Sequence, residues 1–134
     1  MPDFAHIHRV EVRFSDCDPL GHVNHVMFLS YFEHCHLSYW RQETGGINPK
    51  VPLIVAHVEC DYRAPAFFGD QIDVRMNISD IGRSSFSLIF DAVNVTSGAK
   101  LADGKAVLVA YDYATGTPIP LREETRRLLE KTQE

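Results

Sequence analysis

Reactive side chains are concentrated in the segment from Arg13 to His25, which reads RFSDCDPLGHVNH. This segment holds two carboxylates, Asp16 and Asp18, and two imidazoles, His22 and His25. A carboxylate can act as a nucleophile or as a general base, and it then needs a nearby group that polarises the electrophile. The N-terminus of a helix offers such a group, because its first backbone N–H groups are unpaired and carry partial positive charge. A helix that begins at the end of this segment would equip it for acyl transfer or hydrolysis.

The residues on either side predict a strand before the segment and a long helix after it. Apolar residues alternate with charged residues ahead of it, as in a half-buried strand: Val10, Val12 and Phe14. Asp18-Pro19-Leu20-Gly21 has the composition of a type I turn, and Asn24 stands where a helix N-cap belongs. Apolar residues then cover nearly every face of a helix that ends near Gly45-Gly46, so we expect this helix to be buried.

The remainder of the chain predicts an antiparallel sheet. Stretches of apolar or alternating character are typical of strands, and they lie at 53–62, 72–79, 86–95 and 107–113. The alternation slips at Val93, which indicates a β-bulge. Ser97-Gly98 and Asp103-Gly104 are both turn signals, and the sequence does not choose between them. A short amphipathic helix ends the chain, so residues 1–134 are expected to form one α+β domain.

Composition excludes several classes of function. Lys and Arg number 13 against 18 Asp and Glu, so the net charge of −5 argues against a nucleic-acid binder. No apolar run approaches the roughly 20 residues of a membrane-spanning helix, so no membrane partner is expected. The first ten residues lack the pattern of a secretory signal, and the three cysteines show no CxxC spacing. These features predict a cytoplasmic protein with reduced thiols.

The segment from Asp16 to Glu33 resembles the 4-hydroxybenzoyl-CoA thioesterase family of hotdog-fold acyl-CoA thioesterases. The similarity continues through later motifs and spans most of the chain: Tyr62-Arg63-Ala64-Pro65, Gly69-Asp70, Gly82-Arg83-Ser84-Ser85-Phe86 and Thr115-Gly116. The resemblance implies a hotdog fold, in which an antiparallel sheet wraps around one long central helix. It also implies an acyl-CoA substrate, homodimers that pair into tetramers, active sites at the subunit interface, and no metal or other cofactor.

The resemblance assigns roles to individual residues. Asp18 matches the catalytic carboxylate, which either attacks the thioester or activates water, and the sequence does not decide between these mechanisms. His25 matches the first helical residue, whose backbone N–H polarises the thioester carbonyl and whose side chain assists in some relatives. The motif Arg83-Ser84-Ser85 lies where relatives often hold the nucleotide of coenzyme A. Glu33-His34-Cys35-His36 departs from the usual Glu-x-Ala-Arg, so no role of that arginine is transferred.

Other interpretations of the same residues remain open. Asp18 alone could serve only the turn, through an Asx-type hydrogen bond, and Asp16 is expected to be structural. A non-catalytic protein that binds acyl-CoA is the main alternative. A metal hydrolase would use Asp16, Asp18, His22 and His25, but the spacing matches no familiar zinc motif. Self-association is expected on physical grounds too, because one sheet covers only part of an apolar helix and its edge strands invite pairing.

Overall fold

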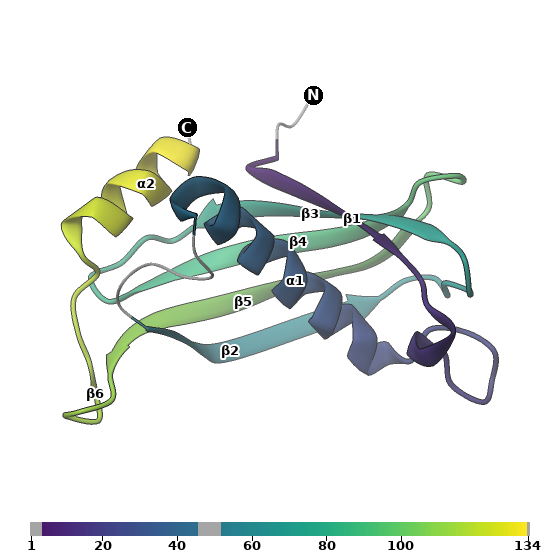
Figure 1. The fold of residues 1–134 in the computed structure, drawn as a ribbon, viewed down its shortest axis with the longest axis horizontal. Coiled ribbons are helices and arrows are strands. Elements are labelled where there is room, and N and C mark those ends of the chain that lie inside the picture. Colours follow the sequence, from purple (N-terminus) through teal and green to yellow (C-terminus); the bar gives the residue numbers. More distant parts are fainter. Residues whose placement is uncertain (1–3, 46–51, 134) are drawn as a thin grey trace.

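The structure is a computed structural model that describes residues 4–45 and 52–133. The described residues form an antiparallel sheet with one long helix packed across it (Figure 1). Along the chain the elements are β1 (His6–Glu11), the 3-10 helix η1 (Phe14–Asp16), α1 (His25–Thr44), β2 (Leu53–Tyr62), β3 (Gln71–Ser79), β4 (Ser85–Asn94), β5 (Lys100–Asp112), β6 (Thr117–Pro118) and α2 (Glu123–Gln133). The order of strands in the sheet is β1-β3-β4-β5-β2, with the short β6 paired to β5. The predicted α+β architecture is confirmed.

The core lies between α1 and the inner face of the sheet. Every second residue of β3 is buried against the helix: Ile72, Val74, Met76 and Ile78. Phe32 of α1 stacks on Phe90 of β4 with ring centroids 4.8 Å apart and an interplanar angle of 9°. A Cβ atom at Gly104 of β5 would meet Phe32 Cε2 at 3.1 Å and collide with the backbone oxygen of Glu59. Glycine at this position therefore lets the helix approach the sheet closely.

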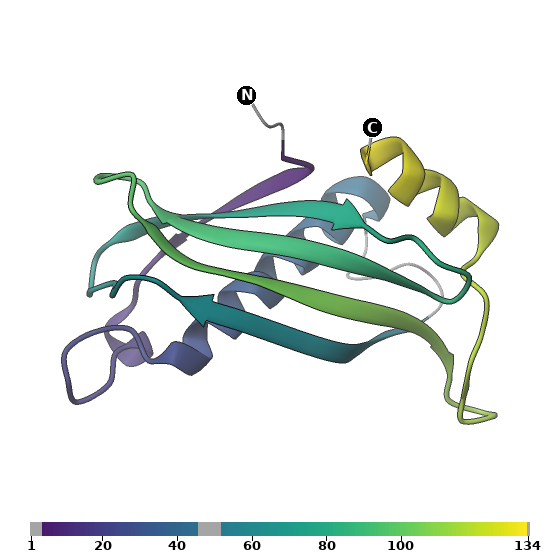
Figure 2. The same cartoon turned by 180° about the vertical axis from the view of Figure 1, so that it is seen from behind.

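Burial of α1 differs from the expectation that its apolar surface is covered on all sides. Its inward side chains are buried: Phe28, Tyr31, Phe32, Cys35, Tyr39 and Trp40. Val26 is 55% exposed, and Glu33, His34 and Arg41 are not buried either. The prediction of all-round burial is therefore wrong for a single chain, because the sheet lies against one side of the helix only. The opposite face of the sheet carries no helix in the described part of the chain (Figure 2).

Several predicted boundaries are confirmed and two are wrong, namely the end of the first strand and the start of the last, which the sequence predicts at residue 107 and which lies at Lys100. Asn24 caps α1, and Gly45 ends it in the left-handed conformation with φ 78°, whereas Gly46 lies outside the described residues. The turn at Ser97-Gly98 closes the β4–β5 hairpin, and the pairing register shifts between Ala92 and Val93 as the predicted bulge requires. The first strand ends at Glu11, and Phe14 belongs to η1 with 79% of its surface exposed. The apolar alternation therefore continues to Phe14, beyond the end of the strand.

The two edges of the sheet are β1 and β2. β2 is ten residues long, and most of its residues are exposed. Val55 and Val58 project from it toward the helix side, because they stand opposite the buried Leu108 and Ala106 of β5. β2 therefore presents an unpaired edge and a half-covered apolar face within the described chain. No helix among the described residues is long and apolar enough to cross a membrane.

Candidate active site

A short loop between η1 and α1 carries the predicted catalytic residues. The backbone N–H of Gly21 donates to the oxygen of Asp18 at 2.9 Å, which confirms the predicted turn over residues 18–21. The N–H of Asp18 donates to the oxygen of His22 at 3.0 Å, so the loop is closed at its base. The N–H of Val23 donates to the oxygen of Ala66 at 2.8 Å. This last bond ties the loop to the segment that follows β2.

The buried carboxylate of Asp16 anchors the loop. It accepts from the Arg13 backbone at 3.0 Å, from the Arg13 guanidinium at 2.9 Å and from the Tyr31 hydroxyl at 2.9 Å. Burial by itself raises the pKa of Asp16, but these hydrogen bonds outweigh burial and hold the pKa below its ordinary value. Burial and the bond to Asp16 raise the pKa of Tyr31. The Asp16 carboxylate therefore links the loop to α1, which agrees with its expected structural role.

One carboxylate oxygen of Asp18 accepts a hydrogen bond within the turn, and the other has no protein partner among the described residues. Its Oδ1 accepts from the N–H of Leu20 at 2.9 Å, which is the Asx-type bond considered from the sequence. No donor to Oδ2 is found in residues 4–45 and 52–133. The structural and the chemical interpretation of Asp18 are thus compatible, because each needs a different oxygen atom.

The first turn of α1 presents an unpaired donor beside Asp18. The Asn24 side chain accepts from the N–H of Val26 at 3.2 Å, and the Asn24 oxygen accepts from Met27 at 2.9 Å. The cap therefore bypasses His25, whose own N–H has no acceptor within the described ranges. An N–H at this position points along the helix axis and carries the positive end of the helix dipole. It is a suitable donor to a developing oxyanion.

Asp18 and His25 line the same pocket, which has a volume of about 480 Å³. His22 also borders it, with Nδ1 placed 3.3 Å from the oxygen of Val23. Phe28 of α1 also lines the pocket, as does Tyr62 at the end of β2, to which sequence reasoning gave no role in the site. The Tyr62 ring meets the His25 ring edge-on, with centroids 5.8 Å apart. No local signal could have placed Tyr62 here, because the contact joins residues from two separate elements.

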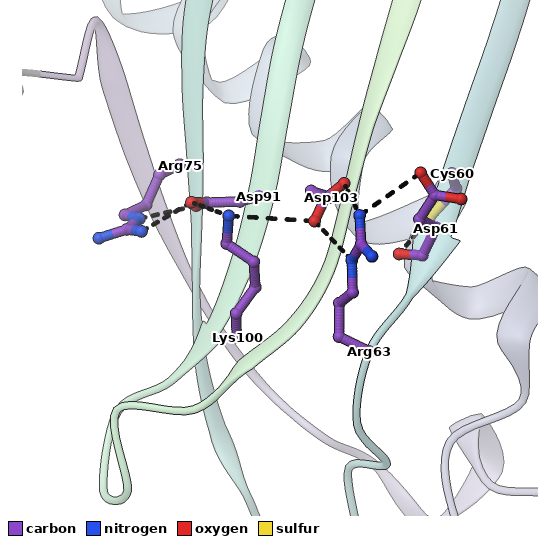
Figure 3. Close-up of polar contacts among 7 residues, drawn as sticks. All are labelled: Cys60, Asp61, Arg63, Arg75, Asp91, Lys100 and Asp103. Atoms are coloured by element: carbon purple, nitrogen blue, oxygen red, sulfur yellow. Dashed lines mark hydrogen bonds and ion pairs between the residues drawn. The ribbon is translucent and has the colours of Figure 1, made fainter.

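Arg63 borders this pocket and also belongs to a charged network on the outer face of the sheet (Figure 3). Its guanidinium donates to both oxygens of Asp103, at 3.0 and 3.1 Å, and lies 3.6 Å from Asp61. Lys100 links Asp103 to Asp91, at 3.9 and 4.0 Å. The Arg63 guanidinium is therefore already paired with two carboxylates, although it lines the pocket and contributes positive charge there.

The predicted coenzyme A residues lie elsewhere in the chain. Ser85 pairs with Val109 in the sheet, whereas Tyr62 pairs with Ala102 seven residues earlier along the same strand β5. The oxygen of Arg83 accepts from Leu121, next to α2. Arg83, Ser84 and Ser85 are therefore at the opposite end of the sheet from Asp18, and one chain does not bring the two groups together.

A separate apolar groove lies between α1 and the sheet, next to β2. Its volume is about 180 Å³, and it is lined from α1 by Leu29, Phe32, Glu33 and His36 and from the sheet by Val55, Val58, Phe90 and Ala106. Glu33, one of the two acidic residues of α1, is exposed. Burial lowers the pKa of His36 to about 4, so this imidazole is neutral at physiological pH.

The residues of the metal-hydrolase alternative do not form a ligand set. In the described ranges, no three side chains of the His, Cys, Asp or Glu type stand close enough together to hold a metal ion. Asp16 in particular is saturated by Arg13 and Tyr31. The pocket thus offers a carboxylate and a backbone donor, which is the equipment for hydrolysis of an activated acyl group.

Comparison with known proteins decides the family. Residues 12–129 match the thioesterase-like superfamily. The chain belongs to this superfamily. The prediction of a thioester hydrolase is confirmed at the level of the family, and the hotdog fold is confirmed by solved thioesterases that share this architecture.

Individual relatives cover almost the whole chain. A thioesterase of Thermus thermophilus, solved in complex with coenzyme A and Zn, is 35% identical, and the match covers 99% of this chain and 98% of that chain with a TM-score of 0.84. The 1,4-dihydroxy-2-naphthoyl-CoA hydrolase of Rippkaea orientalis (strain PCC 8801 / RF-1) is 28% identical over an alignment of 131 residues, and the match covers 91% of this chain and 93% of the relative. YsmA of Bacillus subtilis (strain 168) is 28% identical over 131 residues, which are 97% and 88% of the two chains.

Proposed function

We propose that the protein hydrolyses acyl-CoA thioesters to a free acid and coenzyme A, with Asp18 and His25 as the reacting groups. One observation carries the proposal: a carboxylate with a free oxygen and a helix N-terminal N–H line one pocket. The relatives that act on or bind coenzyme A derivatives support the substrate class.

The thioester carbonyl accepts a hydrogen bond from the N–H of His25, which stabilises the negative charge that develops on its oxygen. Asp18 Oδ2 then acts in one of two ways. It attacks the carbonyl carbon to form a mixed anhydride that water later cleaves, or it takes a proton from the water that attacks. In both cases the carbon–sulfur bond breaks and coenzyme A leaves as a thiolate that is protonated by solvent.

The acyl group extends into the groove between α1 and β2. This groove begins one helical turn beyond His25, because Phe28 lines the pocket and Leu29 and Phe32 line the groove. Its wall is apolar apart from Glu33 and the neutral imidazole of His36. The acyl groups expected are therefore uncharged and apolar, whether aromatic or aliphatic.

The active enzyme is a homo-oligomer built on the β2 edge. Antiparallel pairing of β2 with β2 of a second copy would satisfy its unpaired backbone groups and cover Val55 and Val58. Such pairing brings the start of one β2 to the end of the other. The partner subunit's Arg83, Ser84 and Ser85 would then lie at the end of this subunit's β2 that carries Tyr62, about three strand spacings (roughly 14 Å) away. Arg83–Ser85 is thus proposed to bind coenzyme A across the interface, and dimers are proposed to pair into tetramers.

Light scattering coupled to size exclusion tests the assembly. A dimer or tetramer is expected at micromolar concentration, and a monomer would contradict the interface proposal. The single domain over residues 1–134 and the cytoplasmic location stay predictions.

A panel of acyl-CoA substrates with the variant Asp18→Asn tests the function. Asparagine keeps an Oδ1 that can accept from Leu20, so the turn is expected to survive. Loss of a general base lowers kcat by about 10²–10⁴-fold, and loss of a nucleophile lowers it further. A wild type that binds these thioesters without hydrolysing any of them would favour the non-catalytic binding protein. A folded variant with unchanged kcat would show that Asp18 has only a structural role in the turn.

A further inference from the structure

We propose that the protein holds a second site, on the flank of α1 opposite the catalytic pocket, which binds a phosphate group. A pocket of about 330 Å³ lies there between α1 and the edge strand β1. It is lined by His8 from β1 and by His34, Leu37, Ser38 and Arg41 from α1. Free phosphate and an organic phosphate monoester share the group that these side chains would recognise.

The site is distinct from the catalytic machinery. Residues 34, 37, 38 and 41 recur at the three- and four-residue spacing of one helix face. The catalytic pocket and the acyl groove instead use residues 25, 28, 29, 32, 33 and 36 of the same helix. The pocket beside β1 and the pocket with Asp18 share no lining residue.

Arg41 is the main reason to expect an anion. Other arginines on the sheet are held by two hydrogen bonds to one carboxylate, as Arg75 is by Asp91 at 2.7 Å for both. The Arg41 guanidinium has no acceptor in residues 4–45 and 52–133, and no carboxylate lines its pocket. The whole chain carries a net charge of −5, so acidic side chains are not scarce. A planar guanidinium left free in a concave pocket is suited to bind phosphate oxygens in pairs.

Ser38 can supply a second donor through a buried histidine. Its Oγ lies 2.8 Å from Nε2 of His6, a side chain that is 9% exposed. When His6 donates from Nε2, the Ser38 oxygen accepts, and its hydroxyl proton is free to donate to an anion. Leu37 adds an apolar contact for the organic part of a monoester.

The histidines make the binding depend on pH. Burial lowers the pKa of His8, and the neighbouring His34 lowers it further. Burial and His8 lower the pKa of His6, which Glu43 opposes. A bound phosphate compensates the repulsion among these groups and raises the pKa of His8. Binding should therefore strengthen as the pH falls and His8 gains a proton.

Calorimetric titration of the full chain with inorganic phosphate, and separately with phenyl phosphate, tests the proposal at about pH 6 and about pH 8. Saturable one-to-one binding is expected at the lower pH, with weaker binding at the higher pH. Arg41→Gln should weaken it at least about tenfold, the effect of one lost charge-assisted interaction. Lys131→Gln is the matched control, since Lys131 is a cation on α2 without a protein partner in the described ranges. The affinity of this variant for phosphate should stay at the wild-type value.

Histidine proton signals followed by NMR give a second readout. Phosphate should shift the His8 and His34 resonances and raise the His8 pKa, and thioester hydrolysis by Arg41→Gln should remain at the wild-type rate. Tighter binding of phenyl phosphate identifies a monoester as ligand, whereas equal affinities identify free phosphate. Binding that Arg41→Gln leaves intact, or that Lys131→Gln weakens as much, would overturn the site. So would the absence of saturable binding.

Discussion

The substitution His25→Pro removes the proposed oxyanion donor together with the imidazole, and it leaves the start of α1 intact. The structure tolerates this change for two reasons. Residue 25 is the first residue of α1, where proline is favoured because its missing N–H has no partner in the helix. Asn24 has φ −62° and ψ 134°, the extended conformation that a residue before proline prefers. The Asn24 cap survives as well, because it accepts from Val26 rather than from residue 25.

His25→Ala is the matched control for His25→Pro. Both variants lose the imidazole and its edge-on contact with Tyr62, but only the alanine variant keeps the backbone N–H. Removal of one oxyanion donor costs about 10²–10³ in kcat, or about 2.7–4 kcal/mol of barrier. The pocket is open to solvent at His25, which weakens electrostatic stabilisation, so the loss should lie near the lower end. We expect kcat to fall about 100-fold more in the proline variant than in the alanine variant.

The assay should follow the free acid by chromatography rather than the released thiol. Cys17 and Cys60 are partly exposed free thiols and would react with a thiol reagent. Equal thermal midpoints for the two variants establish that the helix start is intact. Equal kcat values in two folded variants would refute the oxyanion assignment. If these equal values also lie far below the wild-type kcat, the imidazole rather than the backbone N–H would be the principal group.

Three further predictions concern stability and metal dependence. Asp16→Asn should lower the free energy of unfolding by about 1–3 kcal/mol, because an amide N–H₂ would face donors. Folding lowers the pKa of Asp16, so the stability that its carboxylate contributes is present above its unfolded-state pKa and is lost as the pH falls through its folded-state pKa. The free energies of unfolding of the wild type and the variant should therefore converge on acidification. Gly104→Ala should destabilise by about 1–3 kcal/mol, read from denaturant midpoints, because its Cβ meets Phe32 and a backbone oxygen. Dialysis against a chelator should leave the hydrolysis rate unchanged, and recovery of lost activity on adding zinc would contradict this.

Local features of this protein could be predicted from the sequence. The turn over residues 18–21, the Asn24 cap and the Gly45 end of α1 each depend on hydrogen bonds or backbone angles within a few residues. The alternation in β3 is local in the same sense, because each strand residue points opposite to its neighbours. The position of Asp18 just ahead of a helix N-terminus follows from these elements alone.

Features that depend on contacts between distant elements were decided only by the tertiary structure. Asp103-Gly104 has the composition of a turn, yet it lies inside β5 because Phe32 of the helix needs the space above Gly104. Tyr62 joins the pocket because β2 ends beside the start of α1, which no spacing in the sequence reveals. The polar face of α1 is exposed because the sheet covers one side of the helix. Periodicity is a property of neighbours along the chain, whereas the pocket is formed by residues that only packing brings together.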